Sequence, residues 1–227
     1  MSSPVKKPKR RISRGRRRRN ATRQKLLDAA RAVFAERGLD LARIDEITER
    51  ADVGKGTFYN HFGSKKKIIH ETMRCMLSEL VETVERRCHG ITELPELLDA
   101  LIGAHIGFFC TRWEDFVLYF QGRGDLMLVD TYYPGIETPF DDYLACVERL
   151  VDGVIPARHS PAAMRRIACA VAGFVSGYYA FAIISPGDED VDATFASLRQ
   201  PMVASLVRFI REALPGPEDT RPQGAGQ

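Results

Sequence analysis

The chain has 227 residues, of which 44% are hydrophobic and 28% charged, and its formal net charge is +3. This length allows one large domain or two smaller ones with a sizeable core. The run of about 18 apolar residues that a membrane helix needs does not occur, and the N-terminal residues are basic and polar. We therefore expect neither a membrane span nor a secretory signal, and a cytoplasmic location.

The cysteines carry no sign of a structural framework. They are five in number, and none forms a C-x-x-C pair, which argues against disulfides and structural zinc. Most of them fall inside apolar helical patterns, where we expect small buried side chains. The sequence predicts no metal site and no cofactor.

The small net charge hides an asymmetry along the chain. Residues 1–70 hold 20 Lys and Arg against 7 Asp and Glu, whereas the remaining residues hold 13 against 23. A basic N-terminal third on an acidic body indicates a polyanionic partner for the first part only.

The first 20 residues are the most basic stretch. Ten of the fourteen residues from Lys6 to Arg19 are basic, and two prolines and Gly15 interrupt any helix. Charge repulsion and the lack of apolar anchors predict a disordered arm over residues 1–20. Such an arm either aids solubility alone or lies along DNA phosphates or in the minor groove, and its place directly before the motif described below favours DNA.

Apolar spacing predicts four helices in the next part of the chain, over residues 22–37, 43–51, within 51–63 and from 64 to about 87. Gly38 is suited to end the first of them, and Ser64 is a favourable N-cap for the fourth.

The pattern stays helical over the rest of the chain. Helices are expected over residues 94–110, 113–120, 136–154, 161–184 and 192–214. A loop or broken helix is expected over residues 121–135, Pro201 predicts a kink, and residues 215–227 are expected to be a disordered tail. No stretch alternates with period two, so the predicted fold class is all-α.

The clearest motif spans residues 51–67, which read ADVGKGTFYNHFGSKKK. Phe58 and Phe62 are four residues apart and share one helix face, while the other face carries hydrogen-bonding side chains. This pattern is typical of a recognition helix. We expect a helix-turn-helix DNA-binding domain over residues 21–68, joined by the fourth helix to a larger helical domain for ligand binding and dimerisation over residues 69–214.

Residues 22–70 resemble the N-terminal domain of the tetracycline-repressor (TetR) family of transcriptional regulators. The likeness rests on ATRQKLLDAARAVFAERG and IDEITERADVGKGTFYNHFGSK, above all on the A-x-V-x-K-G-T-x-Y-x-H-F spacing. The resemblance implies a homodimer that binds a near-palindromic operator as a repressor and leaves it when a small molecule binds. The rest of the chain matches only in length and helical character.

The sequence departs from the family pattern at several positions. Arg43 and Gly54 stand where hydroxyl side chains usually cap the second and third helices, and Asp52 replaces a turn glycine. Lys65–Lys67 replace a commonly acidic first turn. Three cations in the first turn oppose the helix dipole, at a cost of about 0.3–1 kcal/mol each. Either a bound DNA phosphate compensates this cost, or water screens the charges.

The candidate DNA-contacting residues lie on or beside the short helix. They are Arg43, Lys55, Gly56, Thr57, Tyr59, Asn60, His61, Lys65, Lys66 and Lys67. Changes of Thr57 or Asn60 are expected to alter sequence preference, although Asn60 is also placed to bond a phosphate, whereas loss of a lysine should weaken binding to all sequences alike. Thr48 faces either DNA or the core.

Two half-sites roughly 34–36 Å apart require a dimer. The last two long helices are the candidate interface, because residues 169–184 are apolar nearly all round and Gly173 and Gly177 would let another helix approach. Ordinary core packing accounts for part of the apolar surface of both helices.

The middle of the chain is rich in aromatic residues, which at helical spacing are more often core than pocket. Because helical bundles place ligands between helices, we still expect an effector site there for a mostly apolar or aromatic small molecule. Its candidate residues are His105, Phe109, Trp113, Phe116, Tyr119, Phe120, Met127, Tyr143, Phe174 and Tyr178.

Two other classes of function are the alternatives, an all-α small-molecule enzyme and a non-specific architectural nucleic-acid-binding protein. The sequence contains no nucleophile elbow, phosphate loop or paired metal-ligand spacing, so it assigns no catalytic residue.

Overall fold

The computed structural model describes residues 14–125, 137–155, 159–184 and 191–214. Every regular element within these ranges is a helix, which confirms the all-α fold class. The helices are α1 (Arg14–Leu41), α2 (Ile44–Arg50), α3 (Lys55–His61), α4 (Lys65–Cys88), α5 (Leu94–Cys110), α6 (Trp113–Asp125), α7 (Glu137–Asp152), α8 (Pro161–Ile184) and α9 (Val191–Ala213).

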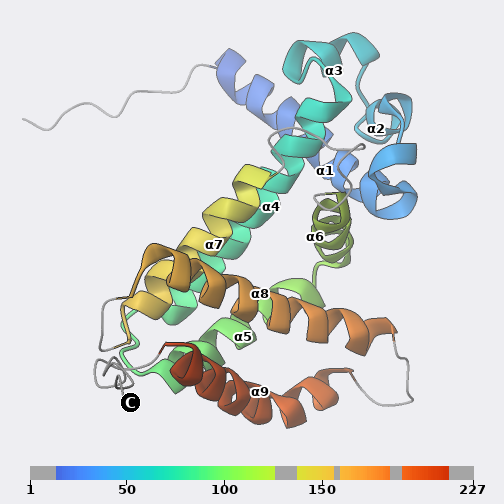
Figure 1. The fold of residues 1–227 in the computed structure, drawn as a ribbon. Coiled ribbons are helices and arrows are strands. Elements are labelled where there is room, and N and C mark those ends of the chain that lie inside the picture. The colour runs from blue at the N-terminus through green and yellow to red at the C-terminus, as the bar shows by residue number, and fades with distance from the viewer. Residues whose placement is uncertain (1–13, 126–136, 156–158, 185–190, 215–227) are drawn as a thin grey trace, which may run out of the picture.

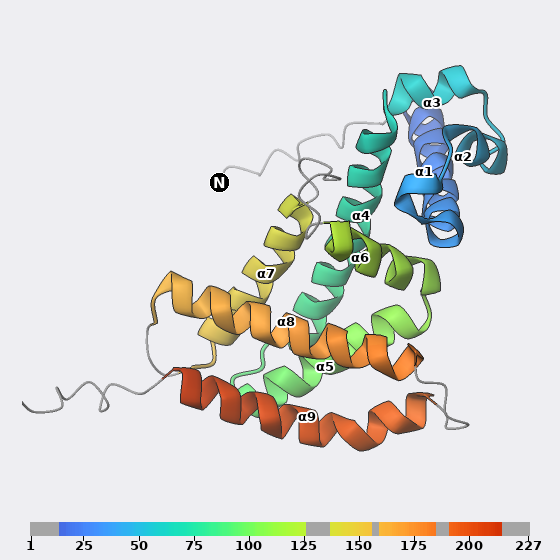
Figure 2. The ribbon, with the colours of Figure 1, turned by 45° about the vertical axis from the view of Figure 1, so that its right-hand side comes forward.

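The long helix α4 connects two groups of helices (Figure 1). Helices α1, α2 and α3 lie at one end of the molecule, and α5, α8 and α9 lie at the other, with α7 packed along α4. Figure 2 shows the same division after a turn of 45°. A second connection exists, because α6 packs closely against α1. The helix-turn-helix group therefore contacts the larger domain both through α4 and through α6.

Buried apolar side chains hold the first group of helices together. Leu26 and Phe34 of α1, Ile47 of α2 and Phe58 of α3 are each fully buried. Complete burial of such a side chain contributes roughly 1.5–3 kcal/mol. These contacts hold three short or amphipathic helices, which would be marginal alone, in one fixed arrangement. Thr48 also lies in this core and donates to the carbonyl of Asp45, so its side chain faces inward.

Helix α1 begins earlier than the sequence predicted. Residues 14–20 were expected to belong to a disordered arm, but they form the first turns of α1. The helix is anchored further along by buried residues, and each added residue then gains a hydrogen bond without a new nucleation step. Arginine is also a good helix former, and both prolines of the arm precede Arg14. Residues 1–13 and the tail 215–227 lie outside the described residues.

The end of the first regular helix was predicted correctly. Gly38 has φ +82° and interrupts the helical geometry within α1. Helix α6 differs more, since it continues through Gly122 to Asp125 rather than ending at Phe120. A Cβ on Gly122 would overlap the methyl group of Met73 on α4, so the glycine permits close packing there. Helix α9 continues through Pro201.

The structure bears on the expectations about the cysteines and about membrane spans. Cys88 and Cys146 are buried as expected, but Cys110 and Cys169 are exposed. Among the described residues no single helix is long and apolar enough to cross a membrane, and the one pair that meets those criteria together, α5 with the first part of α6, is bent by 110°.

Candidate nucleic-acid interface and effector region

The turn between α2 and α3 is held by its backbone. Asp52 adopts a left-handed backbone conformation with φ +53°. A residue that replaces a turn glycine must adopt this conformation, and Asp tolerates it better than most residues. The amide of Val53 donates to the carbonyl of Thr48, and the amide of Thr57 donates to the carbonyl of Gly54 at 2.8 Å. Gly54 caps α3 without a side-chain bond. The turn geometry therefore does not depend on the hydroxyl cap that is missing.

The N-terminus of α2 is capped from one side only. Arg43 occupies the N-cap position, where its side chain has no acceptor to offer, but its amide donates to the carboxylate of Glu46 at 2.9 Å. Asp45 and Glu46 lie in the first turn, where acids favour the helix dipole. The Arg43 side chain itself remains largely exposed.

Helix α3 has the two faces that the sequence predicted. Phe58 and Phe62 are buried, and the ring of Tyr59 meets that of Phe58 edge-on at 5.4 Å between centroids. The residues on the outer side are exposed or half-buried; they are Lys55, Gly56, Thr57, Tyr59, Asn60 and His61. Tyr59 is 48% exposed, an uncommon state for a large aromatic side chain. The fold thus presents all six predicted residues of α3 together on the surface.

Two of the candidate cations share one carboxylate. Lys55 Nζ lies 2.7 Å from Asp45 Oδ1, and Arg43 approaches the same carboxylate at 3.8 Å. The hydrogen bond from Lys55 lowers the pKa of Asp45, and in turn Asp45 raises the pKa of Lys55. An acid beside two cations holds them in place but also competes with an approaching phosphate. The sequence signal for this pair was available, since Asp45 lies in the first turn of the neighbouring helix.

The three consecutive lysines have different environments. Lys65 Nζ donates to the carbonyl of Asp40 at 2.6 Å, and burial lowers the pKa of Lys65. Lys66 and Lys67 are exposed, and the amide of Lys67 donates to the side chain of Ser64, the predicted N-cap, at 3.3 Å. Lys65 therefore supports the C-terminal end of α1, and of the three lysines only the other two are fully exposed to solvent.

A groove of about 630 Å³ runs beside the recognition helix, between α1 and the start of α4. Its lining includes Tyr59, Asn60 and His61 from α3 and Lys66, Lys67 and His70 from α4, together with Arg23 and Glu71. Five of these residues belong to the predicted DNA-contacting set. The groove was not predicted, because it depends on how α1 and α4 cross.

The one acid that lines this groove is neutralised by arginines. Arg23 lies 2.7 Å and Arg74 2.9 Å from Glu71 Oε2, and the Arg23 guanidinium also sits over the ring of Phe62 at 5.3 Å. Burial favours a higher pKa for Glu71, but hydrogen bonds from Arg74 and Arg23 outweigh it and leave that pKa below its usual value. The groove therefore presents a cationic surface to solvent.

The predicted effector residues divide into a buried set and the rest. His105, Phe109, Phe116, Tyr119 and Tyr143 are buried, and Phe120 is partly buried. Trp113 and Phe174 are 56% and 41% exposed, so the structure does not bring them into that buried set. Met127 lies outside the described residues, and so does the side chain of Tyr178.

The buried aromatic rings pack against one another between α5, α6 and α7. Ring centroids lie 5.3 Å apart for Phe109 and Tyr119, and 4.7 Å apart for Phe116 and Phe120. A small cavity of about 10 Å³ lies at this cluster, lined by His105, Ile106, Phe109, Phe120, Val175 and Ser176. This volume holds about one water molecule, so a larger molecule enters only if the helices part.

A buried histidine adds one polar pair to this apolar region. His105 Nδ1 lies 2.9 Å from the carbonyl of Leu101, and Nε2 lies 2.5 Å from the hydroxyl of Tyr143. Because a carbonyl only accepts, Nδ1 carries the proton and the Tyr143 hydroxyl donates to Nε2. Burial lowers the pKa of His105 to about 4, which keeps the imidazole neutral near pH 7.

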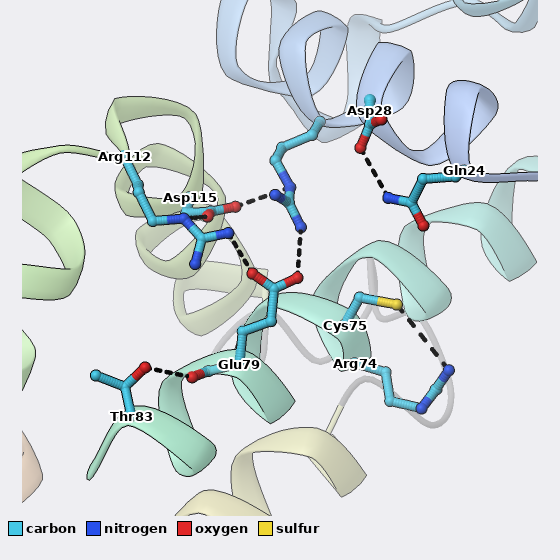
Figure 3. A network of polar contacts seen from close by, with 9 residues as sticks. Gln24, Asp28, Arg74, Cys75, Glu79, Thr83, Arg112 and Asp115 are labelled. Atoms are coloured by element: carbon cyan, nitrogen blue, oxygen red, sulfur yellow. Dashed lines mark hydrogen bonds and ion pairs between the residues drawn. The ribbon is translucent and has the colours of Figure 1, made fainter. Parts of the chain in front are cut away.

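An ion-pair cluster links the two groups of helices and was missed at the sequence level (Figure 3). Asp115 of α6, 1% exposed, lies 2.9 Å from Arg31 of α1 and 2.7 Å from Arg112 before α6. Glu79 of α4 contacts both arginines. Burial raises the pKa of Asp115, and the charges of Arg31 and Arg112 offset part of that rise.

Arg31 carried a signal that sequence reading overlooked. It falls at helical spacing with Leu27 and Phe34, both buried, so its side chain had to point toward a partner inside. A second long-range pair joins α9 to α5, where Arg199 contacts both carboxylate oxygens of Asp99 at 2.6 and 2.7 Å. No group of three or more potential metal ligands occurs among the described residues.

Helix α3 is short, is held by a tight turn against the core that it shares with α1 and α2, and carries polar and cationic side chains on its outer face. This arrangement is typical of the helix-turn-helix class of DNA-binding proteins. Residues 26–72 match the sequence profile of the family described as bacterial regulatory proteins, tetR family. The N-terminal domain of the chain is therefore similar to that of the tetR family.

Several proteins with similar sequences are named as transcriptional regulators. The chain is 29% identical over 132 residues to the uncharacterized HTH-type transcriptional regulator YvdT of Bacillus subtilis, and 32% over 103 residues to the HTH-type transcriptional activator FasR of Mycolicibacterium smegmatis. It is 39% identical over 61 residues to the HTH-type transcriptional repressor KstR2 of Mycobacterium tuberculosis. These matches cover 58%, 45% and 27% of this chain and 66%, 47% and 30% of the three relatives, less than two thirds of each.

A solved structure extends the likeness of fold to most of the chain. The transcriptional regulator FadR from Bacillus subtilis, crystallised in complex with stearoyl-CoA, aligns with a TM-score of 0.66 at 18% identity. The alignment covers 82% of this chain and 97% of that chain. The two-domain helical fold is thus shared beyond the DNA-binding domain.

Proposed function

We propose that this protein is a transcriptional regulator that binds a near-palindromic operator as a homodimer, represses transcription there, and leaves the operator when a mostly apolar small molecule binds. The observation that carries this proposal is the exposed outer face of α3, where Lys55, Thr57, Tyr59 and Asn60 stand over a buried aromatic inner face. The match of residues 26–72 to the tetR family and the names of the relatives support it. Such a protein works on DNA in the cytoplasm.

The surface of the last two helices supports a dimer. Phe174 of α8 and Phe209 of α9 are 41% and 43% exposed, although large aromatic side chains are usually covered. A Cβ on Gly173 or Gly177 would meet no atom within 4 Å, so another helix has room to approach. Both helices lie at the far end of the molecule from α3 (Figure 1). A two-fold axis there would hold two recognition helices apart.

The aromatic cluster supports the effector site. It is mostly apolar, and the His105–Tyr143 pair, with the hydroxyls of Tyr119 and Ser176, gives polar groups that could orient a ligand. FadR, with the same fold, binds stearoyl-CoA, and this makes a long-chain acyl thioester the first probe to test. Because the cavity is small, we propose that an effector separates α5, α6 and α8 when it enters.

The ion-pair cluster supports a route from the effector to DNA. Asp115 precedes Phe116 of the aromatic cluster by one residue, and its carboxylate contacts Arg31 of α1. A shift of α6 would therefore move or break the Asp115–Arg31 contact and change how α1 and α3 are held. By linkage, operator DNA would weaken effector binding by the same factor as the effector weakens DNA binding.

Selection of bound sequences from a random DNA pool, followed by footprinting on the DNA upstream of the protein's own gene, tests the proposal. A regulator yields a two-fold symmetric site and a protected palindrome, whereas an architectural protein yields no consensus and an enzyme yields no binding. Thr57→Ala and Asn60→Ala should change the selected consensus, and Lys67→Gln should weaken binding to all sequences alike. A promoter fused to a reporter separates repression from activation. Stearoyl-CoA, with coenzyme A and stearate as controls, is then titrated against the complex.

A further inference from the structure

The first turns of α1 form a basic extension outside the core of the helix-turn-helix group. Residues 14–20, called the basic extension below, are all exposed, and the first buried residue of α1 is Leu26. At a rise of about 1.5 Å per residue, seven residues reach about 10 Å past the packed part of the helix. Figure 1 shows that this end of α1 lies at the same end of the molecule as α3.

The basic extension concentrates positive charge on a short stretch of helix. Its sequence is RGRRRRN, and the first turn of α1 contains no acid. Arg14, Arg17, Arg18 and Arg19 have no ion pair within the part of the chain that the structure describes. Like charges three and four residues apart repel, and cations at a helix N-terminus oppose the dipole. A helix of this composition is stabilised most by a polyanion beside it.

Helical spacing divides these arginines between two sides of α1. Arg16 and Arg19 fall on the same side as Arg23, which lines the groove beside the recognition helix. Arg14 and Arg18 fall on the opposite side.

The contacts of the groove agree with this division. The charges of Arg19 and Arg23 add to burial in lowering the pKa of His61, which lines the groove, as expected for arginines on this side of α1. Lys66 and Lys67 line the same groove from α4. The groove side of the basic extension therefore continues the row of cations that begins on α4.

We propose that Arg16 and Arg19 of the basic extension join Lys66 and Lys67 in one cationic track that binds the backbone phosphates of DNA flanking each half-site. This inference rests on the proposed function and goes beyond it, because the track lies outside the recognition helix and lengthens the stretch of DNA that each protomer contacts. Phosphate contacts carry no base information, so the track raises affinity without changing the consensus.

The test uses the full-length protein and the palindrome that it selects from a random pool. Two duplexes are compared, one ending at the half-sites and one with about six further base pairs of arbitrary sequence at each end, a length of about 20 Å. The variants are Arg16→Gln with Arg19→Gln, and, as a matched control with the same change of charge, Arg14→Gln with Arg18→Gln. Circular dichroism and thermal melting establish that each variant is folded.

We expect the wild-type protein to bind the longer duplex more tightly, with a steeper dependence on salt. The Arg16/Arg19 variant should lose this preference, and the slope of log K against log salt should fall by about 3–4 for a dimer that loses four contacts. The Arg14/Arg18 variant should keep both the preference for the longer duplex and the wild-type salt dependence. The proposed track would be refuted if both variants lost the preference for the longer duplex equally, or if neither variant lost it. Failure of the wild-type protein to select any palindrome would instead refute the proposed function.

Discussion

The Arg31 guanidinium of α1 lies 2.9 Å from the Asp115 carboxylate of α6, and this ion pair joins the DNA-binding helices to the larger domain. Asp115 is 1% exposed and also meets Arg112 at 2.7 Å. Neither carboxylate oxygen has a hydrogen bond of good geometry, so charge holds the contact together rather than directed bonding. Such a contact is stable while the helices stay in place and weakens when α6 shifts.

Asp115→Asn should therefore lower the free energy of unfolding by about 1–3 kcal/mol, because two partly buried guanidinium groups lose the more buried of their two carboxylate partners. Urea denaturation measures this loss. Asp141→Asn, which breaks an exposed pair with Arg165, is the control and should cost less than about 1 kcal/mol. The Asp115 variant should also need more effector for the same release of operator; an unchanged dose dependence would show that the contact does not transmit the signal.

The pH dependence of stability should report the buried imidazole. The pKa of His105 is about 4 in the folded protein against 6.5 for an unperturbed histidine. Between these values the unfolded chain binds the extra proton, so stability is complete above about pH 6.5 and falls as the pH drops toward 4. The loss attributable to His105 approaches about 3 kcal/mol. His105→Gln should flatten this part of the profile, and an equal slope in both proteins would contradict the assignment.

Removal of the acid that holds Lys55 should strengthen DNA binding. Asp45 lies 2.7 Å from Lys55 at the start of the recognition helix, so Asp45→Asn frees that cation for phosphate and removes a repulsive charge. We expect an affinity gain of about threefold to tenfold at low salt and a steeper salt dependence. Glu36→Gln, which frees Arg50 in the same domain, is the matched control. A loss of affinity in the Asp45 variant would mean that the carboxylate positions Lys55 for binding.

The adjacent lysines should respond differently to the same substitution. Lys65→Gln loses the bond to the Asp40 carbonyl and should lower stability by about 0.5–1.5 kcal/mol, with a small effect on the salt slope. Lys66→Gln should leave stability nearly unchanged and reduce the slope by about 2 per dimer. Chemical denaturation and DNA titrations at several salt concentrations separate these outcomes. Identical behaviour of the two variants would show that Lys65 gives up its carbonyl contact on DNA.

The sequence determined the elements and the motif because both depend on neighbouring residues. Apolar spacing located the helices, Gly38 and Asp52 took the backbone conformations that their turns need, and Ser64 capped α4. The spacing of Phe58 and Phe62 placed the outward residues of α3 correctly, since a helix fixes which side chains share a face. Local signals failed at the ends of elements, where α1 extended to Arg14 and α6 to Asp125.

Tertiary structure alone decided which charged groups remain available and how the two domains are joined. The sequence groups Lys65 with Lys66 and Lys67, but Lys65 donates a hydrogen bond to the carbonyl of Asp40, 25 residues earlier in the chain. Asp115 and Arg31 are 84 residues apart and meet only because α6 crosses α1. Such contacts depend on the packing of helices far apart in sequence, and periodicity within one helix carries no information about the partner that will face it.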